Sequence, residues 1–463
     1  MAAAPWFHVC GSGDVDGWAA VCASLAATGF DLNPRERNAE PGAGIVCFSE
    51  IDDELLEVLR EVSHGGAERI LAVPAAEARL DVQQAWQLLR AGASDVVAWS
   101  SAADVAERIK ARFERWAAVD ALIEAPLVRD TLIGASPVWR ATLRCAVEVA
   151  RFTDASVLLI GESGTGKELM ARLIHELDAR ERKGELVLLD CSTIVPELSG
   201  SEFFGHERGA FTGAVAAREG AFATAHGGSL FLDEVGELPM RLQAQLLRAV
   251  QERTYKRVGG NAWHRTDFRL VSATNRDLSQ CIERGEFRSD LYHRIASWVF
   301  RIPPLRERRD DILPLARHAL RALRPDAPSL DFDAPVRDYL INRAYPGNVR
   351  DLRQLVTRIA SRHVGPGPIT LGEIPDDERP RDVAAPRQWR DAEFAEGIRQ
   401  ALSSGAKLKE ISHAAAETAI RLAVHDENGN LQVAARRLGV TDRALQMRRA
   451  ARLNGGGEGH GAK

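Results

Sequence analysis

The chain has 463 residues, a net charge of -5, 45% apolar residues and 27% charged residues. These values are typical of a soluble globular protein of about three domains, and they exclude a wholly disordered chain, a collagen-like chain and a small disulfide scaffold. The sequence contains no apolar run of about 18 residues, which a membrane span would need, and it does not begin with the basic segment of a secretory signal. The six cysteines show no CxxC or zinc spacing. We therefore expect a cytoplasmic protein with reduced thiols.

The first 118 residues alternate short apolar runs with helical patterns. The runs cover 6–10, 44–48, 69–73 and 95–99, and the helical patterns cover about 16–28, 52–63, 81–91 and 102–122. Strands that alternate with helices predict βαβ units around a parallel sheet. The last helical pattern is long, so we expect it to continue as a linker helix over 119–130.

A second α/β pattern covers residues 131–371. Strands are predicted at 156–160, 186–189, 229–232 and 268–273, and the pattern becomes helical after Phe300. Residues 372–400 belong to a stretch rich in Pro, Gly, Asp and Arg and are expected to form a linker. Residues 401–453 are helical and rich in Ala and Arg, and the Gly-rich end at 454–463 is expected to be disordered.

A glycine-rich loop follows the strand predicted to end at Ile160, and a helical pattern follows the loop. It consists of Gly161, Glu162, Ser163, Gly164, Thr165, Gly166, Lys167 and Glu168. In such a loop the glycines let backbone N–H groups turn toward phosphates, and the lysine reaches the β- and γ-phosphates. Glu168 departs from the generic pattern, because Ser or Thr usually holds Mg²⁺ there. The strand before and the helix after favour a phosphate loop over a chance Gly-rich turn.

Two later strands end in polar residues that suit phosphoryl transfer. Asp233 and Glu234 follow an apolar run, and we expect Asp233 to bind Mg²⁺ and Glu234 to polarise the attacking water. Asn275 follows another apolar run and is a candidate to sense the γ-phosphate or to orient water. Acidic or amide residues at strand ends are common, so these assignments depend on the phosphate loop.

Further motifs accompany the phosphate loop. They read FGHER at 204–208, GAFTGA at 209–214, LDEVGE at 232–237, FRSDLYHR at 287–294 and YPGNVR at 345–350. With the loop GESGTGKE, they resemble the sigma-54-dependent transcriptional activators, or bacterial enhancer-binding proteins, over about residues 131–371 and 391–452. These are AAA+ ATPases. GAFTGA is close to diagnostic, and this family shows Glu after the loop lysine.

The resemblance implies an AAA+ P-loop α/β domain with a helical lid, which binds ATP with Mg²⁺ and assembles into a ring, most often a hexamer. It also implies a mobile surface loop that grips sigma-54, with Phe211 and Thr212 at its tip. That loop is formed by Gly209, Ala210, Phe211, Thr212, Gly213 and Ala214. A small, Gly-flanked segment with an exposed aromatic residue suits a contact loop.

The resemblance assigns further residues to the nucleotide. Arg288 and Arg294 are implied to be arginine fingers that reach the ATP of the neighbouring subunit, where a guanidinium stabilises the transition-state charge. Arg350 matches the sensor II arginine of the lid, and Ile133 with Gly134 matches the segment near adenine. One position departs from the family: Asp190 stands where many relatives have an Asn that couples to the catalytic glutamate. An ionised Asp accepts hydrogen bonds but does not donate them.

The C-terminal region shows the sequence pattern of a helix-turn-helix. Residues 401–463 carry 10 Lys or Arg against 6 Asp or Glu, whereas residues 1–120 carry 10 against 19, so a nucleic-acid partner is indicated for the basic end. Gly439 permits a turn between two helices, and the segment resembles a Fis-type module that binds upstream sites on double-stranded DNA as a dimer. The candidate DNA contacts are Thr441, Arg443, Gln446 and Arg449. An ordinary helical hairpin is the alternative.

The N-terminal region resembles a response-regulator receiver in element order but lacks its chemistry. Gly11, Ser12 and Gly13 follow the first strand instead of an acidic cluster, and Trp99 stands where the receiver lysine would be. We therefore expect a degenerate, doubly wound receiver-like domain whose input is protein binding, small-molecule binding or no signal at all. An unrelated α/β sensory domain is the alternative.

The leading hypothesis is a DNA-bound activator that hydrolyses ATP to remodel sigma-54 RNA polymerase holoenzyme from a closed to an open promoter complex. It predicts three parts: the receiver-like domain, the AAA+ domain and an all-α helix-turn-helix domain. Two alternatives remain, a DNA-bound regulator that does not use sigma-54 and an AAA+ unfoldase. The intact GAFTGA segment disfavours the first, and no threading aromatic loop supports the second.

Overall fold

The computed structural model describes residues 5–10, 17–35, 42–66, 68–75, 80–180, 184–194, 199–379, 392–426 and 431–441. The chain divides into two compact units, Met1–Pro375 and Asp376–Lys463. No helix in these ranges is both long and apolar enough to cross a membrane.

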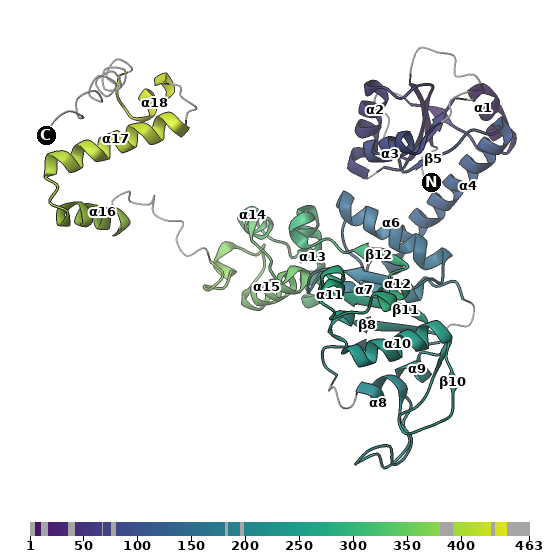
Figure 1. Ribbon diagram of the computed structural model, residues 1–463. Coiled ribbons are helices and arrows are strands. Elements are labelled where there is room, and N and C mark those ends of the chain that lie inside the picture. Colours follow the sequence, from purple (N-terminus) through teal and green to yellow (C-terminus); the bar gives the residue numbers. More distant parts are fainter. Residues whose placement is uncertain are drawn as a thin grey trace, which may run out of the picture. The chain divides into compact units, whose positions relative to one another are not determined.

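The N-terminal part of the first unit is a five-stranded parallel sheet with the strand order β2-β1-β3-β4-β5. This is the doubly wound, receiver-like order. Helices α1 and α4 cover one face and α2 and α3 cover the other (Figure 1). The elements are β1 (Trp6–Cys10), α1 (Trp18–Ala27), β2 (Asn33–Pro34), β3 (Gly44–Phe48), α2 (Asp53–Ser63), β4 (Ile70–Pro74), α3 (Val82–Ala91), β5 (Asp95–Val96) and α4 (Ala102–Glu124).

This sheet differs from the sequence-based prediction at both edges. The edge strand β2 has only two residues and carries no apolar run, so hydrophobic patterning alone does not reveal it. At the other edge, β5 ends at Val96 and not at residue 99. The three longer strands β1, β3 and β4 and the four helices were predicted correctly to within a few residues.

Helix α4 contributes to two hydrophobic clusters. Its first half packs Ile109, Phe113 and Trp116 against the receiver-like sheet. Its second half places Val119 and Ile123 in the core of the next domain. The segment predicted as a linker helix is therefore part of the second core.

The second sheet is also parallel and has the order β12-β6-β11-β8-β7. Its strands are β6 (Val157–Ile160), β7 (Leu186–Asp190), β8 (Ser229–Asp233), β11 (Arg269–Thr274) and β12 (Trp298–Arg301). The helices around it are α5 (Pro126–Arg129), α6 (Pro137–Phe152), α7 (Lys167–Glu176), α8 (Ser199–Phe204), α9 (Ala221–Thr224), α10 (Met240–Glu252), α11 (Leu278–Glu283) and α12 (Ser289–Ile295). A short antiparallel pair, β9 (Thr254–Tyr255) and β10 (His264–Arg265), lies outside the sheet.

A helical lid follows the sheet. It contains α13 (Ile312–Leu323), α14 (Ala334–Asn342) and α15 (Asn348–Arg362). Its hydrophobic cluster includes Ile369 and Ile374, so the lid extends past residue 371, where the sequence predicted a linker.

The second unit is helical in its described residues. It contains α16 (Ala392–Ser403), α17 (Leu408–Asp426) and α18 (Leu431–Arg437), with Ala423 and Ala434 buried between α17 and α18. Helix α16 lies within the stretch that was predicted to be a linker up to residue 400. Gly439 has a φ of 67°, the left-handed conformation that suits a turn after α18.

Candidate nucleotide site

The phosphate loop (161–168) joins β6 to α7 at the carboxyl end of the sheet. Gly164 and Gly166 have φ values of 76° and 105°, which residues with a Cβ atom rarely adopt. The loop ends in Lys167, the first residue of α7, whose side chain is buried. Backbone N–H groups at the helix start and a lysine beside them make this edge suitable for phosphates.

Lys167 and Glu234 meet at this edge. The Lys167 ammonium donates to the Gly161 carbonyl oxygen at 2.9 Å and to Glu234 Oε1 at 3.2 Å. The other carboxylate oxygen of Glu234 accepts from the backbone N–H of Asn275 at 3.0 Å. The structure therefore brings together three predicted catalytic residues, from the start of α7 and from the ends of β8 and β11.

The backbone at Glu234 is in the left-handed region, with a φ of 49°. This conformation is uncommon for a residue with a side chain and is concentrated at functional sites. It turns the carboxylate back toward Lys167 directly after strand β8. Asn275 contributes its backbone N–H to this arrangement.

Asp233 ends β8 beside the Glu234 carboxylate, and its Oδ1 accepts from the Glu234 N–H at 3.0 Å. Burial, followed by the charge of Glu234, raises the pKa of Asp233, while Lys167 opposes that shift. A half-buried carboxylate with a raised pKa gains from a nearby cation, so the oxygen donors fit Mg²⁺. Glu168 forms an ion pair with Arg172 at 2.7 Å on the exposed side of α7.

The lid contacts the phosphate loop directly. The Glu162 carboxylate accepts two hydrogen bonds from Arg306, at 2.8 and 2.6 Å, and one from Asn348 at 3.1 Å. These hydrogen bonds lower the pKa of Glu162. Arg350, the predicted sensor II residue, donates to Ser163 Oγ at 3.3 Å. The Glu162 side chain thus faces the lid, whereas Ser163 lies next to the sensor arginine.

The segment predicted to lie near adenine is fixed by Asp311. Its carboxylate accepts from the N–H groups of Ala135 and Ser136 at 2.7 and 2.8 Å, and from Ser136 Oγ at 2.7 Å. A Cβ on Gly134 would lie 2.4 Å from the Trp139 ring and 2.8 Å from Asp311 Oδ2. Ile133, next to Gly134, packs against the lid cluster.

Arg308 adds a second bridge from the lid side. It donates to the Thr165 carbonyl oxygen at 3.0 Å and lies over the Trp139 ring, 4.2 Å from its centre. Burial lowers its pKa to about 10, so it remains a cation at neutral pH. Sequence reasoning missed Arg306, Arg308 and Asp311, which lie over 130 residues from the segments they bind.

The predicted contact loop (209–214) lies between α8 and α9. It closes on itself through a hydrogen bond from Gly209 N–H to the Ala214 carbonyl at 2.8 Å. Thr212 is exposed, and the Phe211 side chain is 37% exposed, with its ring edge-on to His206 at 5.0 Å. The chain here runs away from the body of the sheet (Figure 1).

Comparison with known proteins identifies the family. A model of the sigma-54 interaction domain matches residues 132–301, and a model of the AAA+ ATPase lid domain matches residues 306–388. The chain is 42% identical over 325 residues to the transcriptional regulatory protein ZraR of Klebsiella oxytoca, a match that covers 70% of this chain and 69% of that protein. The chain belongs to the sigma-54-dependent transcriptional activators.

Two further relatives agree. This activator is 40% identical over 330 residues to the response regulator protein PilR of Pseudomonas aeruginosa, with 70% of each chain covered. It is 47% identical over 235 residues to a Nif-specific regulatory protein of Bradyrhizobium diazoefficiens, a match that covers 50% of this chain and 40% of that protein. The central domain of the activator is therefore an AAA+ ATPase domain that interacts with sigma-54, as its motifs implied.

Both predicted arginine fingers of the activator are engaged by partners other than the phosphate loop of the same chain. Arg288, just before α12, forms a two-pronged ion pair with Asp290 at 3.0 and 2.7 Å. Arg294 donates to the Val250 carbonyl oxygen at 3.4 Å. Arg294 is exposed, and the Arg288 side chain is 38% exposed.

Asp190, the departure from the family pattern, ends β7 and is paired in register with Asp233. Its Oδ1 accepts from Ser192 N–H at 2.9 Å and from Ser192 Oγ at 2.6 Å. Glu234 is held by Lys167 and Asn275 instead, so these hydrogen bonds do not link Asp190 to it.

The predicted DNA contacts are only partly described. Thr441 is exposed. Arg443, Gln446 and Arg449 lie outside the described residues.

Proposed function

We propose that this activator hydrolyses ATP at the interface between subunits of a hexameric ring and uses the energy to move the contact loop against sigma-54. The C-terminal domain holds the ring at an upstream DNA site as dimers, through Thr441, Arg443, Gln446 and Arg449. The observation that carries the proposal is the Lys167–Glu234–Asn275 arrangement beside the phosphate loop, in a chain that also presents the exposed GAFTGA segment.

The Lys167–Glu234 ion pair supports a simple catalytic sequence. Phosphates at the loop attract the Lys167 ammonium, which weakens its bond to Glu234 Oε1. The Glu234 carboxylate is then free to accept a proton from the attacking water, while the Asn275 N–H keeps it in place. Asp233 would hold Mg²⁺, which would supply positive charge to the phosphate oxygens.

The exposed arginines support assembly-dependent hydrolysis. Arg288 is held by the carboxylate of Asp290 in an exposed ion pair, which contributes little to stability and exchanges readily. A γ-phosphate from a neighbouring subunit offers the guanidinium a stronger partner. Hydrolysis then requires two adjacent subunits, and Arg294 is the second candidate arginine of this segment.

The test is single-round transcription from a sigma-54 promoter with full-length protein. We expect Lys167→Ala to abolish both ATP hydrolysis and open-complex formation. We expect Thr212→Ala to keep ATP hydrolysis within about twofold of wild type, because residue 212 lies outside the nucleotide site, and to lose open complexes. Full open-complex formation by Thr212→Ala would refute the loop's role. Activity on a sigma-70 promoter without sigma-54 would favour regulation by another route.

A further inference from the structure

One buried amide joins three segments around the phosphate loop. Asn348 is 1% exposed and begins helix α15 of the lid. Its Oδ1 accepts from the Leu305 N–H at 2.8 Å, and its Nδ2 donates to the Ser163 carbonyl oxygen and to Glu162 Oε2, both at 3.1 Å. The side chain therefore ties the start of the lid and helix α15 to the loop that binds phosphate.

The backbone at Asn348 is in the left-handed region, with a φ of 52°. Asn tolerates this conformation better than most residues other than glycine, but it remains unfavourable. A conformation of this kind persists only where the surroundings enforce it, and it concentrates at functional sites. The unfavourable backbone conformation and the three side-chain hydrogen bonds thus occur in the same residue.

Backbone contacts beside Asn348 reinforce the junction. The Val349 N–H donates to the Gly164 carbonyl oxygen at 3.0 Å. A Cβ on Gly164 would lie 2.2 Å from the Gly347 carbonyl oxygen. Gly164 is thus required by the close approach of the lid backbone as well as by its own positive φ.

Arg350 lies two residues after Asn348, and its guanidinium donates to Ser163 Oγ at the loop. The Arg350 side chain is exposed, so its direction depends on where the first turn of α15 is fixed. Arg306 strengthens the same junction by its paired hydrogen bonds to Glu162. Because that ion pair is exposed, the buried amide is the more important anchor.

We propose that Asn348 is a positioning residue for ATP hydrolysis, which holds the first turn of α15 on the phosphate loop so that the Arg350 guanidinium faces the bound phosphates. Glu162 serves as the loop's anchor for the lid, and its backbone alone faces the nucleotide. The inference rests on the proposed nucleotide role of the loop and adds the residue that aligns the lid with it.

The first variant is Asn348→Gly in the full-length protein. Glycine adopts a φ near +50° freely, so the backbone keeps its shape while the three side-chain hydrogen bonds are lost. We expect the KM for ATP to rise about tenfold, with kcat changed less than about twofold, because Arg350 contributes mainly to binding ATP. The matched control is Arg317→Gln, which breaks the Arg317–Asp331 ion pair within the lid and leaves KM unchanged.

A double-mutant cycle separates positioning from general support of the fold. If Asn348 acts through Arg350, the KM of Asn348→Gly combined with Arg350→Ala equals that of Arg350→Ala alone. Additive effects on KM would overturn the inference, as would a KM for Asn348→Gly within about twofold of wild type. Absence of ATP hydrolysis in the wild-type protein would instead refute the proposed function.

A second pair of variants tests the anchor even if the glycine variant folds poorly. Asn348→Asp places a carboxylate against that of Glu162, so we expect a rise in KM above that of the glycine variant. Adding Glu162→Gln exchanges donor and acceptor, because the new amide at 162 donates to the new carboxylate at 348. We expect the KM of this double variant to be about threefold lower than that of Asn348→Asp alone. An unchanged KM would contradict the contact between residues 162 and 348.

Discussion

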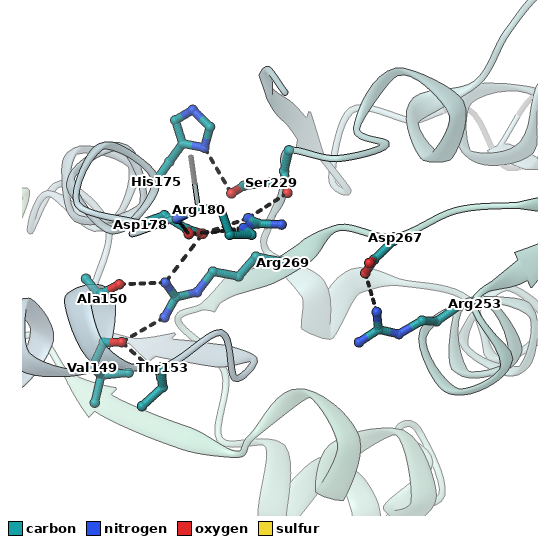
Figure 2. A network of polar contacts seen from close by, with 11 residues as sticks. Val149, Ala150, Thr153, His175, Asp178, Arg180, Ser229, Arg253, Asp267 and Arg269 are labelled. Atoms are coloured by element: carbon teal, nitrogen blue, oxygen red, sulfur yellow. Dashed lines mark hydrogen bonds and ion pairs between the residues drawn. The ribbon is translucent and has the colours of Figure 1, made fainter. Parts of the chain in front are cut away.

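Two groups of charged side chains lie at opposite ends of the AAA+ sheet. At the carboxyl end, Lys167 and Glu234 meet beside the phosphate loop. At the amino end, Arg269 begins β11 and is enclosed by protein (Figure 2). It donates to the carbonyl oxygens of Ala150 and Val149 at 2.9 and 3.1 Å and lies 3.7 Å from Asp178.

The partners of the amino-end group are all internal. The Asp178 carboxylate is 3% exposed and accepts from Arg180, which also donates to the Gly228 carbonyl oxygen at 3.0 Å. Next to it, His175 Nδ1 lies 2.9 Å from Ser229 Oγ (Figure 2). This group joins the ends of α6 and α7 to the starts of β8 and β11, so we infer that it serves the fold.

In the carboxyl-end group, Lys167 has more hydrogen-bond donors than the described residues provide acceptors. The Lys167 ammonium carries three N–H donors, and among the described residues it has two acceptors, Gly161 and Glu234. The comparison teaches that charges whose partners are all internal hold the sheet together, whereas charges that keep an open donor at the loop edge serve a ligand.

The largest effect is expected for Glu234→Gln. The amide keeps the size of the side chain but no longer takes a proton from water, so we expect kcat to fall about 10²- to 10³-fold. The free energy of unfolding should change far less than for a variant of Arg269. ATPase assays at saturating ATP, together with urea unfolding, check both statements. A kcat within tenfold of wild type would show that another residue is the base.

Arg269→Met is expected to give the opposite result. Removing one member of a buried ionic group leaves uncompensated polar groups, so we expect the free energy of unfolding to fall by about 3 kcal/mol. The KM for ATP of the folded variant should stay within about twofold of wild type, because Arg269 lies at the far end of the sheet. Urea unfolding measures the first quantity and ATPase assays the second.

The control for Arg269→Met is Arg324→Gln, which removes an exposed ion pair with Asp326. We expect it to leave the free energy of unfolding almost unchanged, because an exposed ion pair contributes little to stability. Equal losses for the two variants would mean that burial of the Arg269 guanidinium has no special weight.

A smaller, pH-dependent effect is expected at Asp178. Burial opposes its ionisation, but hydrogen bonds from Arg180 outweigh burial and lower the pKa of Asp178 below its usual value. A lowered pKa means that the ionised carboxylate stabilises the fold above the unfolded-state pKa of about 3.9, and that this contribution is lost as pH falls through the folded-state value.

The variant that reveals this pH dependence is Asp178→Asn. We expect its difference from wild type in unfolding free energy to be constant from about pH 8 to pH 5 and to shrink below about pH 4. Urea unfolding across this range provides the measurement, and a difference that stayed constant down to pH 3 would contradict the role of Arg180.

The sequence predicts the carboxyl edge better than the amino edge for a physical reason. Parallel strands end at one edge, and Lys167, Asp233 and Asn275 all come after predicted strands, so the sequence indicates that they lie at the same edge. Arg269 stands at the start of an apolar run, and nothing local indicates that its guanidinium turns inward to α6. The carbonyl groups of Ala150 and Val149 that it binds are 119 and 120 residues away, and their position depends on the packing of helices.

The lid contacts show the same limit. Arg306 and Asp311 bind segments that precede them by more than 140 residues. Their positions follow from how the lid packs on the phosphate loop, which periodicity does not report. Asn348 lies within a motif, but its conformation and its three hydrogen bonds are tertiary features.

Asp190→Asn is expected to have the smallest effect. Burial and Glu234 dominate the raised pKa of Asp233, and Asp190 adds the weakest contribution to that rise. Removing its charge should therefore move the acid limb of kcat/KM slightly to lower pH, with kcat at pH 8 within about twofold of wild type. A pH profile of ATP hydrolysis measures both.

The result at Asp190 sharpens the division between the two ends of the sheet. Its carboxylate lies at the carboxyl edge, yet its hydrogen bonds from Ser192 are local. If kcat at pH 8 changed more than about tenfold in Asp190→Asn, residue 190 would have to exchange Ser192 for Glu234 during the reaction. Position at the loop edge, and not the partners seen in the structure, would then decide which charges serve the ligand.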